Sequence, residues 1–65
     1  MKVNKAKLNY AMAAACLTTS ELGEKTGLPR GTFLNAVVGK NVRPKTAGLI
    51  AKALGVKIEE LIEEV

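Results

Sequence analysis

Hydrophobic residues recur along the chain at helical spacing, and residues that begin or end helices separate the runs. In the first run Leu8, Ala11, Met12 and Ala15 lie at positions i, i+3, i+4 and i+7, which is typical of one buried helical face. Asn4 precedes this run, and an asparagine side chain can accept a hydrogen bond from the free amides of a first helical turn. The pattern predicts a first helix that begins directly after Asn4.

The next two predicted helices are short and closely spaced. Thr18 and Glu21 have the spacing of a capping box, in which each side chain accepts a hydrogen bond from the other residue's amide. Gly27 suits the left-handed position that ends a helix. Pro29 is predicted to open a third helix, because its fixed φ and missing amide are harmless in a first turn. Gly39 ends that helix.

Two further helices complete the prediction. A fourth helix is expected to begin at Pro44 and to end at Gly55. The same i, i+3, i+4, i+7 spacing occurs at Ala47, Ile50, Ala51 and Leu54 and again at Ile58, Leu61, Ile62 and Val65. No window alternates in the manner of a strand. We therefore expect an all-α fold of five helices, in a single domain over residues 1–65.

The second and third predicted helices, over about residues 18–38, match a helix-turn-helix unit with a glycine in its turn. Gly23 lies in the middle of a helix, where glycine costs about 1 kcal/mol relative to alanine. A closely crossing partner helix would explain a glycine there. The apolar residues that such a unit needs are present at Leu22, Leu28, Phe33 and Ala36. The alternative is an ordinary compact helical hairpin.

The placement of charge favours a polyanionic partner. The chain carries ten Lys and Arg against six Glu, a net charge of +4. Four of these acids fall within the last seven residues, so residues 1–58 hold ten basic residues against two acidic ones, a net of +8. A domain this basic attracts polyanions, of which DNA is the commonest in the cytosol. The alternative is a lysine-rich surface that serves solubility alone.

Several classes of function are not expected. Histidine and aspartate are absent, and the single cysteine, Cys16, can form neither an intrachain disulfide nor a zinc site. We therefore expect no metal, no cofactor and no enzyme, since general acid–base chemistry lacks its usual groups. A lone thiol suits the reducing cytoplasm. No apolar run approaches the ~20 residues of a membrane helix, so no membrane partner is expected.

Three segments carry a resemblance to a known family. They are LTTSELGEKTGL at residues 17–28, RPKT at 43–46 and IAKALGV at 50–56. Together they resemble the phage-repressor-like (Cro-like, XRE-type) helix-turn-helix family, and the likeness extends over roughly residues 8–62. The resemblance implies a compact five-helix bundle of the lambda-repressor-like type. It also implies binding of double-stranded operator DNA, usually as a homodimer, to regulate transcription, with no small-molecule ligand expected.

The resemblance also implies roles for individual residues. The third helix would be the recognition helix in the major groove. Arg30 is the best candidate base reader, because a guanidinium can pair bidentately with guanine. The other base-reading candidates are Thr32, Leu34 and Asn35. The candidates for contacts to the DNA backbone, which fix register without reading sequence, are Thr19, Lys40, Asn41, Arg43 and Lys45.

The chain departs from the family pattern at several positions. Val37 and Val38 replace a frequent Glu-Asn pair, and Gly31 stands where a reading side chain is common. Cys16 replaces a frequent glycine, and we interpret it as a small packing residue. Leu34, Val38 and Val42 are either ordinary core or a surface for a partner subunit. The same two roles are open for Val37, and the sequence does not decide between them.

The sequence thus predicts a DNA-binding transcriptional regulator, a repressor or Cro-like switch protein that acts by occupying its operator. The alternative is a protein-interaction module of the same fold, an antitoxin-like or adaptor protein. Binding that weakens strongly with salt would favour DNA as the partner. Salt-insensitive binding to a protein would favour the alternative.

Overall fold

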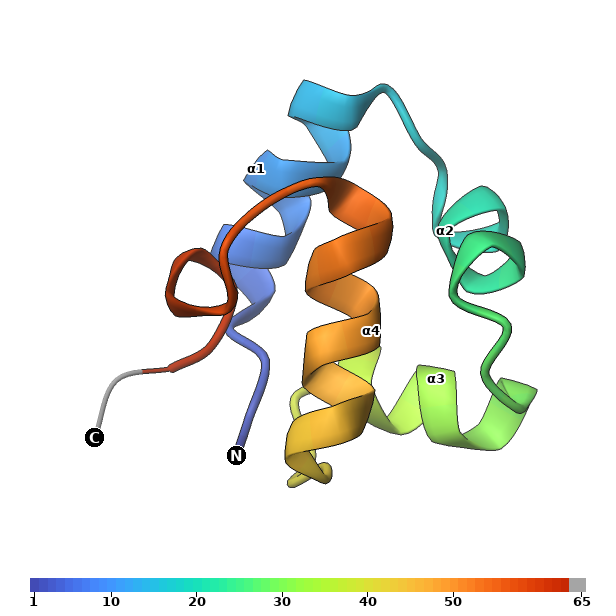
Figure 1. The fold of residues 1–65 in the computed structure, drawn as a ribbon, viewed down its shortest axis with the longest axis vertical. Helices are drawn as coiled ribbons and strands as arrows, with labels where there is room; N and C mark the ends of the chain where they lie inside the picture. Colours follow the sequence, from blue (N-terminus) through green and yellow to red (C-terminus); the bar gives the residue numbers. More distant parts are fainter. Residues whose placement is uncertain (64–65) are drawn as a thin grey trace.

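The computed structural model describes residues 1–63, which form four α-helices and one short 3-10 helix. They are α1 (Lys5–Ala15), α2 (Thr19–Thr26), α3 (Arg30–Val37), α4 (Pro44–Leu54) and η1 (Ile58–Glu60) (Figure 1). Helix α4 occupies the centre and contacts α1, α2, α3 and η1. The expected all-helical class is confirmed for this part of the chain. None of its helices has the length and apolar character to cross a membrane.

Most helices begin and end at the residues that the sequence predicts. The Asn4 Oδ1 accepts a hydrogen bond of 2.9 Å from the Lys7 amide at the start of α1. At the start of α2 the Thr18 amide donates to Glu21 Oε1 at 2.9 Å, and the Glu21 amide donates to Thr18 Oγ1 at 3.1 Å. Gly27 ends α2 with a φ of 69°. Both ends of α3 are shifted: Pro29 is its N-cap and not its first residue, and its C-cap is Val38, one residue before the predicted Gly39.

The capping box also affects the titration of Glu21. The hydrogen bonds from the backbone and side chain of Thr18 favour the charged carboxylate, so they lower the pKa of Glu21 below its ordinary value. A carboxyl whose pKa is lowered by folding contributes its stability above the unfolded-state pKa and loses it as the pH falls through the folded-state pKa. The capping box is therefore complete at neutral pH and weakens in acid.

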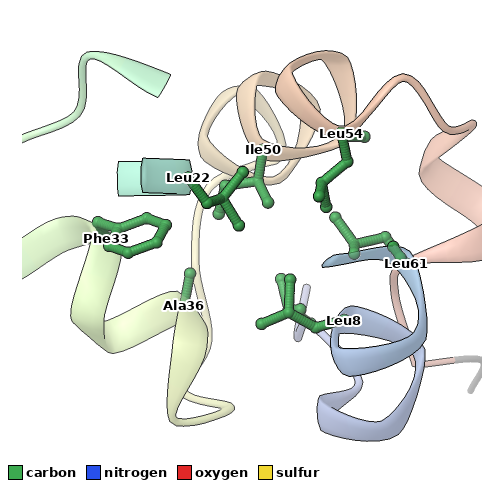
Figure 2. Close-up of a cluster of buried hydrophobic side chains, with 10 residues drawn as sticks. Leu8, Leu22, Phe33, Ala36, Ile50, Leu54 and Leu61 are labelled. Atoms are coloured by element: carbon green, nitrogen blue, oxygen red, sulfur yellow. The ribbon is translucent and has the colours of Figure 1, made fainter. Parts of the chain in front are cut away.

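The core lies between α4 and the surrounding helices. Leu22, Ile50 and Leu61 come from three different elements, and each is at most 1% exposed. Figure 2 shows their side chains with those of Leu8 and Leu54, which close the cluster on the side of α1. Burial of a large aliphatic side chain contributes about 1.5–3 kcal/mol. This shared core fixes the position of α2 and α3 relative to α4.

The predicted fifth helix is wrong over the described residues. The helix stops after the single turn Ile58–Glu60, with Leu61 as its C-cap. Its backbone groups pair with the N-terminal segment: the Asn4 amide donates to the Leu61 carbonyl, and the Glu63 amide donates to the Lys2 carbonyl, each at 2.9 Å. Val65, which completed the predicted apolar face, lies outside the described residues.

Residues 1–3 connect two distant parts of the chain. The Val42 amide donates to the Met1 carbonyl at 2.8 Å, and Val3 forms an isolated antiparallel bridge with Ile62. Val3 is 1% exposed and belongs to the core cluster. The N-terminal segment therefore holds the 40–43 connection on one side and residues 61–63 on the other.

Cys16 is not the packing residue that we expected. It is exposed and ends α1 in the left-handed conformation, with a φ of 57°. The Leu17 amide then donates to the Met12 carbonyl at 3.0 Å, which closes the end of the helix. A side chain costs roughly 1–2 kcal/mol in the left-handed conformation, so glycine would suit this position better than cysteine.

Cys16→Gly should therefore stabilise the protein, by about 0.5–1 kcal/mol after the greater freedom of glycine in the unfolded chain is subtracted. Urea unfolding of the variant measures the gain. Cys16→Ala is the matched control, because it removes the thiol but keeps the Cβ atom. Equal stability of the two variants would show that the left-handed conformation at position 16 carries no strain.

Candidate nucleic-acid interface

Helix α2 contacts α3 at Gly23 through the ring of Phe33, where the sequence predicts a close approach. A Cβ atom on Gly23 would lie 3.1 Å from Phe33 Cε2 and 3.2 Å from Phe33 Cδ2. Both distances are shorter than ordinary van der Waals contact. The Phe33 ring itself is buried beside Leu22 and Ala36 (Figure 2). The missing side chain at position 23 thus sets how near α3 approaches α2.

This packing leaves one face of α3 free. Phe33 and Ala36 point into the core, whereas Arg30, Leu34 and Asn35 are exposed. Gly31 lies on the same exposed face, and a Cβ atom there would meet nothing within 4 Å. Thr32 is half-buried at the edge of this face. Three of the four base-reading candidates therefore share a solvent-facing surface, and Thr32 flanks it.

A recess of about 510 Å³ lies on one side of this face, between α2 and α3. Arg30 and Leu34 of α3 line it together with Thr19, the first residue of α2. The floor is formed by Gly23 and Phe33. The structure thus brings two base-reading candidates and one backbone candidate together.

A second recess of about 520 Å³ lies on the other side of α3, toward the start of α4. Thr32 and Asn35 of α3 line it together with Asn41 and Arg43 of the connection. Thr46 of α4 also contributes to the wall. The remaining backbone candidates, Lys40 and Lys45, are exposed on the connection and on the first turn of α4 and line neither recess.

Thr46 was missed by sequence reasoning. It is 7% exposed, and none of the side-chain hydrogen bonds within residues 1–63 involves it. No buried side-chain nitrogen or oxygen atom in that part of the chain lacks a partner, so the Thr46 hydroxyl is not sealed in the core. It opens into the second recess. The signal in the sequence was a hydroxyl residue two positions after Pro44, at the start of a helix.

The start of α4 offers further hydrogen-bond donors beside this recess. Arg43 is the N-cap, and its side chain makes no capping hydrogen bond. The first amides of a helix have no partner within the helix, and they carry the positive end of the helix dipole. The amides of Lys45 and Thr46 are in this position. The second recess is therefore suited to an anion.

Basic residues dominate the sequence around the two recesses, and the one acidic residue that lines either of them is Glu24 of α2, in the first recess. Between Glu24 and Glu59 the chain has no acidic residue and has seven basic ones. This stretch includes all of α3 and α4 and the connection between them. No acidic side chain of α3, α4 or their connection competes with a bound polyanion at this surface.

The three valines left open by the sequence have different surroundings. Val37 and Val42 are half-buried and pack against the core cluster. Val38 is 51% exposed and Leu34 is 40% exposed. Neither of these two belongs to the core cluster or to the side chains packed against it within residues 1–63. The prediction of a core position is thus correct for Val37 and Val42 and wrong for Leu34 and Val38.

Comparison with known proteins agrees with this geometry. The family model described as Cro/C1-type HTH DNA-binding domain matches residues 7–65. No curated protein matches the chain. Among solved structures, a point mutant of hydroxyethylphosphonate dioxygenase is similar, with a TM-score of 0.80 and 25% sequence identity. That likeness covers 100% of this chain and 14% of the dioxygenase chain.

Proposed function

Because the chain belongs to the Cro/C1-type helix-turn-helix DNA-binding domain family, we propose that it is a sequence-specific regulator of transcription that reads operator DNA through α3. The observation that carries the proposal is the exposed face of α3. It projects between two recesses, and residues 25–58 contain no acidic residue, so that Glu24 is the one acidic residue in the lining of either recess. The phosphates of a duplex require such a surface on both sides of an inserted helix.

Arg30 is proposed to read a guanine. It lies in the first turn of α3, the part of a recognition helix that meets base edges in the major groove. Its guanidinium can donate two parallel hydrogen bonds to guanine O6 and N7. Asn35 is proposed to address an adenine from the same face, and Thr32 to contact the DNA beside it.

The backbone candidates are proposed to hold the two strands on either side of α3. Thr19 would contact a phosphate beside the first recess. The second recess would receive a phosphate between Asn41, Arg43 and the Thr46 hydroxyl, with the free amides of α4 as further donors. Such contacts fix the register of the protein on the duplex and carry no sequence information.

We also propose that residues 1–65 act as one domain and that two copies occupy one operator as a homodimer. Two recognition helices one helical turn apart would then read a two-fold symmetric site. Occupancy of the site would exclude or recruit polymerase, which makes the chain a repressor or Cro-like switch. The likeness to the dioxygenase extends over 14% of that enzyme and carries no activity to this chain.

Selection of binding sites from random duplexes, followed by a salt titration on the selected site, tests the proposal. The expected result is one preferred sequence, for which a plot of log Kd against log[salt] has a slope of several units. Absence of a preferred duplex, with salt-insensitive binding to a protein partner, would replace it by the antitoxin-like or adaptor reading.

Lys40→Ala and Arg43→Ala should each weaken binding to all duplexes by a similar factor and lower the salt slope by roughly 1. The reason is that each removes one charge beside a phosphate but no base contact. Lys52→Ala, which removes the same charge from the last turn of α4, is the control and should leave the slope nearly unchanged. An effect confined to one sequence would instead place Lys40 or Arg43 in a groove.

A further inference from the structure

The centre of the proposed reading face is apolar. Leu34 and Val38, which we call the apolar strip, lie four residues apart on α3 and its C-cap, and the Val38 amide donates to the Leu34 carbonyl at 3.0 Å. Residues at i and i+4 project from the same side of a helix. Large exposed hydrophobic residues are few in residues 1–63: Met1, Tyr10, Leu34 and Val38. Two of the four therefore fall on α3 or its C-cap.

The apolar strip has no role in the core, as shown above, and basic residues flank it along the chain. Arg30 lies one turn before Leu34, and Lys40 follows Val38 after a single glycine. An occupant of this surface must therefore combine an anionic rim with an apolar centre. The major groove of DNA has both, because phosphates border it and the pyrimidine C5-methyl group projects into it.

Taking the proposed DNA binding as given, we propose that the apolar strip reads the C5-methyl group of a pyrimidine in the major groove. Thymine and 5-methylcytosine both carry this group. Cα atoms four residues apart in a helix are separated by about 6 Å along its axis, which corresponds to one or two base-pair steps of about 3.4 Å. A methyl group that Leu34 contacts would therefore lie one or two base pairs from the guanine that Arg30 reads.

The test uses the selected duplex, in which one methyl group at a time is removed or added. Each thymine is replaced in turn by deoxyuridine, which lacks only the methyl group, and each cytosine by 5-methylcytosine. Loss of one buried methyl contact should weaken binding by about three- to fivefold. For the wild-type chain we expect this loss at one or two thymines, or the matching gain at one or two cytosines. These two arms distinguish the sources of the methyl group.

Protein variants assign the effect to the apolar strip. In Leu34→Ala and Val38→Ala the ratio of Kd between the methyl-free and the methylated duplex should approach one at those positions. Tyr10→Ala removes an exposed hydrophobic side chain from α1 and is the control that should keep the full effect. Urea unfolding checks that all three variants are folded.

The outcomes separate the two proposals. Specific binding in which no methyl substitution changes Kd by more than about 1.5-fold would overturn methyl reading and leave DNA recognition intact. A methyl effect that persists in both strip variants would also overturn it. Loss of dimerisation in Leu34→Ala without any methyl effect would assign the apolar strip to a second copy of the chain. Absence of a preferred duplex would overturn the proposed function itself.

Discussion

Replacing Gly23 by leucine should lower the free energy of unfolding by about 1–3 kcal/mol or more. Even a Cβ atom at this position lies 3.1 Å from Phe33 Cε2, so a leucine side chain has no room between α2 and α3. The Phe33 ring is buried and cannot move away without disturbing Leu22. Urea or thermal unfolding measures the loss, and DNA affinity should fall with it because α3 is displaced.

Gly48→Leu is the matched control for this effect. Gly48 also lies inside a helix, in α4, but a Cβ atom there would meet nothing within 4 Å. A non-glycine residue should be neutral or stabilising at that position, by up to about 1 kcal/mol, because it favours the helix. For Gly23→Ala we expect a free energy of unfolding between those of the two leucine variants, because the gain in helix propensity offsets the tight contact with Phe33. Tolerance of leucine at position 23 would mean that the two helices do not cross there.

Arg30→Ala should weaken binding to the preferred duplex by about 1–3 kcal/mol and relax the preference at one base position. Among the candidates on the exposed face of α3, Arg30 alone can form a bidentate pair with guanine. Competition binding against duplexes changed at each position measures both effects. Random duplexes should lose much less affinity than the preferred one.

Two controls separate base reading from charge. Lys25→Ala removes one exposed positive charge from the last turn of α2 and should cause a small loss that is the same for all duplexes. Arg30→Lys keeps the charge but loses the planar pair of donors, so it should still relax the preference. An equal loss on preferred and random duplexes in Arg30→Ala would make Arg30 a phosphate contact.

The four α-helices were predictable because the signals that bound them are local. Asn4 and the Thr18–Glu21 capping box each act within three residues, and Pro44 and Gly55 act through their own backbone conformations. The crossing at Gly23 was also predictable, since a glycine in mid-helix needs a neighbour to explain it. These signals do not depend on the rest of the fold.

The features that failed depend on distant partners or on backbone geometry that periodicity does not contain. Residues 58–65 have the same apolar spacing as α4, but pairing of residues 61–63 with residues 2–4 replaces a continued helix. The left-handed conformation of Cys16 is visible only in the backbone. The division of the candidates between two recesses, and the part played by Thr46, follow from how α3 packs against α2 and α4.

The N-terminal segment has a consequence for the order of folding. Its backbone hydrogen bonds join residues that are 41 to 61 positions apart, from Met1–Val42 to Lys2–Glu63. Contacts of such sequence separation carry the largest loop-closure entropy, so they form after the local helices and their packing. The hydrogen bonds that residues 1–2 make to the 40–43 connection, which includes Asn41 and Arg43, therefore form late in folding. A chain in which residues 1–3 have not yet docked would lack these contacts beside the second recess.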